Sequence, residues 1–168
     1  MSSTKLIHFN PAKVSEIDKD EMGFVRLSKA LLTSPAWRYK STLVTKLIDF
    51  LCIEYLNHAG TENGNLLATY KQLTSYGIGK QYINLTIQEA EELGLLICDR
   101  GVRINVCDSY PNKFRLTFFK SKEKDNFNRQ IYIAPTKEWK HISEENAISI
   151  SKRYKSLRSN INRKRGSK

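Results

Sequence analysis

The side chains of this chain with the clearest chemistry are long polar groups between positions 80 and 88. They are Lys80, Gln81, Tyr82, Asn84 and Gln88. An amide side chain can pair bidentately with adenine, a lysine can reach a guanine edge or a phosphate, and a tyrosine can touch a phosphate or a thymine methyl group. If one helix carries all five, its outer face can read base edges in the major groove of duplex DNA. The alternative interpretation is an ordinary solvated helix face.

Apolar spacing predicts that these side chains lie on the outer face of a helix over residues 79–93. Its predicted inner face consists of Ile83, Ile87, Ala90 and Leu93. A shorter helix is predicted over residues 69–76, opened by Thr69, and Gly77 supplies the turn because glycine tolerates a positive φ. Glutamates at positions 89, 91 and 92 are expected at the far end of the second helix, clear of phosphates.

A β-hairpin is predicted directly after the second helix. Residues 95–98 and 114–118 have strand composition. The basic residues associated with this hairpin could reach along a phosphate backbone or into a minor groove: Arg100, Arg103 and Lys113. Cys98 and Cys107 flank the hairpin and could face each other, but three cysteines without a Cys-x-x-Cys pair favour reduced thiols.

Residues 24–119 resemble a winged helix-turn-helix DNA-binding family of bacterial phages, plasmids and integrated elements. The resemblance rests on residues 24–25, 31–37, 62–66, 76–78, 89–95 and 115–117. It implies an α+β, mainly α fold in which a recognition helix enters the major groove beside a small antiparallel hairpin, the wing. It also implies a transcriptional regulator or a replication-initiator-like factor. Many such helices carry a basic residue where this chain has Leu85, which we expect to touch thymine methyl groups or to pack on the wing.

Three regions are predicted: a polar arm over residues 1–22, the winged helix-turn-helix domain over 23–120, and a C-terminal extension over 121–168. Within the domain, residues 42–57 form the clearest amphipathic helix. Ser34 and Pro35 mark a helix start, Trp37 is expected to anchor the core, and residues 24–27 form a short strand or an extended segment.

The extension is predicted to hold a charged linker over residues 120–129 and a strand over 130–135 on the sheet edge. Trp139 is expected to anchor it, and a basic amphipathic helix is predicted to start near Ser143. The apolar stripe of this helix packs either on its own domain or on a second copy in a homodimer; its members are Ala147, Ile150, Tyr154, Leu157 and Ile161. Residues 162–168 are expected to be a disordered basic tail.

The net charge of +11 favours a polyanionic partner. Residues 146–168 contribute +8 of it, which leaves +3 for the rest of the chain. Within this segment, the predicted DNA contacts are Lys152, Arg153, Arg163, Lys164 and Arg165. A winged helix that only holds another protein, with a solubilising tail, is the alternative.

No Ser-His-Asp set, glycine-rich phosphate loop or zinc-ligand spacing is present in the sequence, so we predict a protein that is not an enzyme. We also predict no cofactor, bound metal, small-molecule ligand or membrane partner. The first residues carry no apolar signal segment and no apolar run reaches 18 residues, so a cytoplasmic, nucleoid-associated protein is expected.

Overall fold

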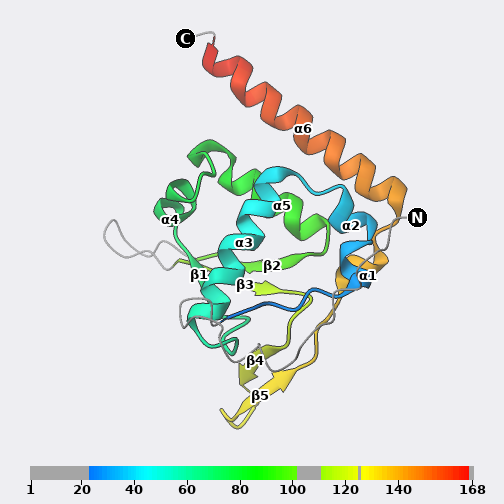
Figure 1. The fold of residues 1–168 in the computed structure, drawn as a ribbon. Helices are drawn as coiled ribbons and strands as arrows, with labels where there is room; N and C mark the ends of the chain where they lie inside the picture. Colours follow the sequence, from blue (N-terminus) through cyan, green and yellow to red (C-terminus); the bar gives the residue numbers. More distant parts are fainter. Residues whose placement is uncertain (1–22, 102–110, 125, 167–168) are drawn as a thin grey trace, which may run out of the picture.

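The computed structural model describes residues 23–101, 111–124 and 126–166 (Figure 1). The predicted N-terminal arm, Arg103 and Cys107 lie outside these residues. Residues 23–27 form neither helix nor strand, so the extended alternative for residues 24–27 is the correct one.

Serine caps start the first three helices. Ser28 caps α1 (Lys29–Leu32), Ser34 caps α2 (Pro35–Arg38) and Ser41 caps α3 (Thr42–Asn57), each by accepting a hydrogen bond from a backbone N–H in the first turn. Pro35 occupies the first position of α2, as predicted. Trp37 is half-buried and its ring meets Phe118 edge to face, so it packs against the core.

Helix α3 crosses the centre of the fold (Figure 1) and has the bounds predicted from the sequence. Its buried side chains recur at helical spacing: Val44, Leu47, Ile48, Leu51 and Cys52. They face apolar residues of α5 (Ile83–Glu92) and of the sheet. The predicted inner face of the second helix is confirmed, because Ile83, Ile87, Ala90 and Leu93 are all fully buried.

The main sheet has three antiparallel strands in the order β1-β3-β2. The strands β2 (Leu96–Asp99) and β3 (Asn112–Leu116) form the predicted hairpin, with Cys98 opposite Phe114. Strand β1 (Leu66–Ala68) was not predicted and pairs with the other edge of β3. Three residues give too short a pattern to distinguish a strand from a loop by periodicity.

A second, two-stranded sheet corrects the prediction for residues 120–135. The expected linker contains β4 (Ser121–Lys124), which pairs antiparallel with β5 (Gln130–Ile133). The strand predicted to lie on the edge of the main sheet therefore belongs to a separate hairpin, at the bottom of Figure 1.

The 3-10 helix η4 (Glu138–His141) connects this hairpin to the last helix, and Trp139 is buried as predicted. The backbone of η4 approaches Gly94 so closely that a Cβ on Gly94 would lie 2.7 Å from Trp139 N, and Gly94 has φ +65°. Glycine is required there for both reasons. Helix α6 (Glu144–Gly166) then crosses the domain. The prediction of a disordered tail from residue 162 was wrong for residues 162–166, which continue this helix.

The described chain is therefore α+β, mainly helical with a small antiparallel sheet. In the part of the chain that the structure describes, no helix has both the length and the apolar character needed to cross a membrane.

Candidate nucleic-acid interface

The two short helices before β2 are built by local signals. Thr69 forms a capping box with Gln72 at the start of α4 (Tyr70–Ser75). Gly77, with φ +91°, ends the following turn. The chain then enters the 3-10 turn η3 (Lys80–Tyr82), which leads directly into α5. The predicted second helix is therefore a 3-10 turn followed by an α-helix.

Four of the five predicted base-contacting residues are exposed: Lys80, Gln81, Asn84 and Gln88. We call Gln81, Asn84 and Gln88 the amide strip: Asn84 and Gln88 lie one turn apart on α5, and Gln81 lies in the 3-10 turn that leads into it. Tyr82 is different, since it is half-buried and its hydroxyl donates a hydrogen bond to Oδ1 of Asn162 on α6. Leu85 is also half-buried.

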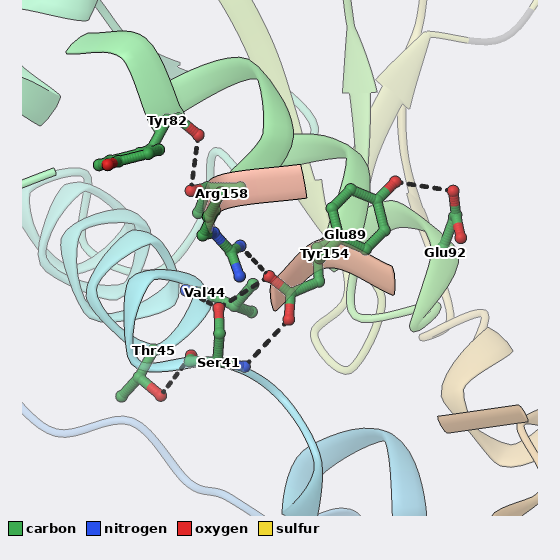
Figure 2. Close-up of polar contacts among 9 residues, drawn as sticks. Ser41, Val44, Thr45, Tyr82, Glu89, Glu92, Tyr154 and Arg158 are labelled. Atoms are coloured by element: carbon green, nitrogen blue, oxygen red, sulfur yellow. Dashed lines mark hydrogen bonds and ion pairs between the residues drawn. The ribbon is translucent and has the colours of Figure 1, made fainter. Parts of the chain in front are cut away.

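Glu89, Glu91 and Glu92 lie at the C-terminal end of α5, as predicted, and each has polar partners that the sequence did not indicate. Glu89 is fully buried and accepts hydrogen bonds from the backbone N (3.1 Å) and Oγ (2.7 Å) of Ser41, and its carboxylate also pairs with Arg158 (Figure 2). The ion pair and the hydrogen bonds from Ser41 together compensate the Glu89 carboxylate for its loss of contact with water.

The other two glutamates have partners as well. Glu91 accepts a hydrogen bond from Cys98 N (3.0 Å) and pairs with Arg100. Glu92 accepts one from the Tyr154 hydroxyl (2.7 Å), drawn in Figure 2, and pairs with Arg153. Burial raises the pKa of Tyr154, so its phenol keeps the proton that it donates. Each acid of α5 is thus joined to a basic residue.

The two described residues that were predicted for the wing, Arg100 and Lys113, lie on different faces. Arg100 lies beside α5 through its pair with Glu91. Lys113 is exposed on β3 opposite Asp99 and Leu67, and it alternates with the buried Phe114. Its side chain therefore lies on the sheet face away from the core, where it lines a cavity of about 610 Å³ with Arg115 and Lys122. The structure does not place Lys113 with the amide strip.

Helix α6 docks on its own domain along the predicted apolar stripe. Ala147 and Tyr154 are buried, and Ile150 packs against the core. At the start of α6, Glu144 accepts a hydrogen bond from the Tyr39 hydroxyl (2.7 Å) and lies 3.5 Å from Arg38. The intramolecular alternative therefore holds for this part of the stripe, which leaves Leu157, at 39% exposure, as the open member.

The predicted basic contacts of α6 have different surroundings. Lys152, Arg163 and Lys164 are exposed, whereas Arg153 pairs with Glu92. Arg165 belongs to the last turn of the helix. Arg158 was not predicted as a site residue, and only 14% of its side chain is exposed. Ser41 was missed for the same reason: each acts through Glu89, and sequence spacing does not show which distant residues meet around a buried carboxylate.

Comparisons with known proteins give no family assignment. No family model matches the chain, and no curated protein or solved structure matches it at a significant level.

Proposed function

We propose that the protein binds duplex DNA in a sequence-specific manner, with α5 as the recognition helix of a winged helix-turn-helix. The order of elements supports this proposal: α3, α4 and α5 are followed by the β2–β3 hairpin, whose far end leads to residues 102–110. In such a module the second helix of the helix-turn-helix pair lies in the major groove, and here that helix is α5.

The amide strip is the observation that carries the proposal. Gln81, Asn84 and Gln88 are exposed, Asn84 and Gln88 lie one turn apart on α5, and each amide offers the paired donor and acceptor that adenine matches. Lys80 precedes them in η3, at the N-terminal end of α5, where both its charge and the positive end of the helix dipole attract phosphates. Each nearby glutamate is joined to an arginine, which reduces the repulsion that free carboxylates would exert on phosphates.

The same face is a poor candidate for holding another protein. The centres of protein interfaces are enriched in aromatic side chains and methionine, and the amide strip contains neither. The apolar Leu85 beside it is half-buried. DNA reading therefore fits this surface better than the protein-interaction alternative.

Within this function, the protein acts as a transcriptional regulator or a replication-initiator-like factor of a bacterial mobile element, and its compartment is the cytoplasm, at the nucleoid. The test is selection of bound duplexes from a random pool, followed by footprinting on the enriched sequence. An enriched motif with a protected major groove supports the proposal, and recovery of unenriched DNA contradicts it.

A further inference from the structure

Helix α6 runs antiparallel to α5 and lies directly beside it. Three contacts define this arrangement: Glu92 with Arg153, Glu89 with Arg158, and Tyr82 with Asn162. Residue numbers fall along α5 as they rise along α6. With Glu144 held by Tyr39 at the other end, α6 is fixed to the domain over about 27 Å of helix, at 1.5 Å per residue.

The contacts also show which edge of α6 lies nearest the amide strip. Successive residues of a helix are rotated by about 100°, so Glu92 lies about 40° around α5 from Gln88, whereas Glu89 lies about 100° away. Glu92 is therefore the docking residue closest to the strip. Because Arg153 pairs with Glu92, the edge of α6 that carries Arg153 lies on the same side of the molecule as the amide strip.

Helical spacing identifies the other residues of that edge. Positions 153, 157, 160 and 164 follow one another at intervals of four, three and four residues and so share a face. We call Arg153, Leu157, Asn160 and Lys164 the edge stripe; all four are exposed. Lys152, Lys155 and Ser159 are also exposed, but they lie on a different side of α6 by the same spacing.

We propose that the edge stripe is a second DNA-contacting element, which binds the sugar–phosphate backbone next to the groove occupied by α5. This inference rests on the proposed function. The major groove, about 12 Å wide, admits one helix, and packed helices lie about 8–10 Å apart. When α5 occupies the groove, α6 lies over its border.

The chemistry of the edge stripe fits this position. The Lys164 ammonium and the Asn160 amide N–H groups donate hydrogen bonds to phosphate oxygens. Lys164 lies two residues beyond Asn162, whose partner is Tyr82, so it lies near η3, which carries Lys80 and the first strip residue, Gln81. Arg100, held by Glu91 at the start of the wing, approaches from the other side of α5. Helix α6 thus serves as a counterpart of the wing.

Two matched pairs of α6 variants test this proposal, because the members of each pair change net charge equally on different sides of one helix. Lys164→Glu alters the edge stripe, and Lys155→Glu is its matched control; Asn160→Glu and Ser159→Glu form a second pair. All four positions are exposed, and thermal melts verify that each variant is folded. Affinity for a 30-base-pair duplex is measured by fluorescence anisotropy at two salt concentrations.

We expect Lys164→Glu to weaken binding by about tenfold or more, the loss of one charge-assisted hydrogen bond, and Lys155→Glu to have a much smaller effect. Equal losses in both members of each pair would overturn the proposal, because only general charge would then matter. If neither the edge-stripe variants nor their controls lose affinity, the proposal is also overturned. Base reading by the amide strip is tested separately with Asn84→Ala. If the wild-type protein binds no duplex DNA, the proposed function fails together with this inference.

Discussion

The carboxylate of Glu89 and the guanidinium of Arg158 form an ion pair between two helices, and the residues are 69 positions apart in sequence. Glu89 also accepts hydrogen bonds from Ser41, the N-cap of α3. One carboxylate therefore joins the start of α3, the middle of α5 and the docked face of α6. This arrangement makes the orientation of α6 depend on a buried charge.

Removing the arginine of this pair should strongly destabilise the protein. Arg158→Met leaves the Glu89 carboxylate without its cation, and breaking a buried pair in this way costs about 3–5 kcal/mol. Urea unfolding measures the change. Arg38→Met is the control, because Arg38 and Glu144 are each 52% exposed and such surface pairs contribute about 0–1 kcal/mol. A double variant, Glu89→Gln with Arg158→Met, should recover part of the loss; if Arg158→Met costs no more than Arg38→Met, the buried pair does not hold α6.

Asn63 should be a second position of high cost. It is fully buried, its side-chain amide donates to the backbone O of Leu116 (2.9 Å) and of Phe119 (3.2 Å), and its Oδ1 accepts from Leu116 N (2.7 Å). Asn63→Ala leaves these groups unpaired, at a cost of about 2 kcal/mol or more. Asn57→Ala, at the exposed end of α3, should change the melting temperature little. Similar melting temperatures for the two variants would contradict this role.

Local patterns predicted the elements whose signals lie within a few residues. The bounds of α3, the inner face of α5 and the cap at Thr69 each depend on spacing or on one capping side chain, and the structure confirms them. The roles of Asn63 and Glu89 could not be found in this way. Both looked like surface residues by type, and their burial depends on partners 53 and 48 positions away, Leu116 and Ser41.

The candidate site was predictable to the same extent. Exposure of the amide strip follows from the period of the buried residues of α5. The contacts that α6 makes with Tyr82 and Glu92 do not follow from this period, because they depend on the path of the chain after β3. The β4–β5 hairpin was missed for a related reason. Strand β4 is rich in charged residues and lacks the apolar alternation typical of a strand, and its pairing with β5 cannot be read from its own sequence.

The two described cysteines should react slowly with alkylating reagents. Burial raises the pKa of Cys52 to about 12 and that of Cys98 to about 11, and the thiolate is the nucleophile. In a Cys107→Ser background, iodoacetamide at pH 8 should label the native protein slowly and the urea-unfolded protein quickly. Because both folded-state pKa values are raised above the ordinary 9.0, these thiols should also lower stability as pH rises from about 9 towards 11 or 12. Rapid native labelling at both cysteines would contradict their burial.

Binding to DNA should weaken with salt, with log affinity falling linearly against log salt concentration at a slope of about −0.9 per phosphate contacted. Truncation after Asn162 removes Arg163, Lys164, Arg165 and Lys168 but retains the docking residues of α6. It should flatten the slope and leave the melting temperature nearly unchanged. A slope identical to that of the full chain would show that these four basic residues make no phosphate contacts.

The central claim, base reading by α5, is tested most directly by comparing Asn84→Ala on two duplexes of equal length. One carries the sequence enriched from a random pool, and the other has that sequence scrambled. We predict a loss of about 1–3 kcal/mol on the enriched duplex and almost none on the scrambled duplex, because a bidentate base contact contributes only at its own site. Asn57→Ala, which removes an exposed amide at the end of α3, serves as the control. Equal losses on both duplexes, or no loss on either for Asn84→Ala, Gln81→Ala and Gln88→Ala alike, would contradict the assignment of α5 as the recognition helix.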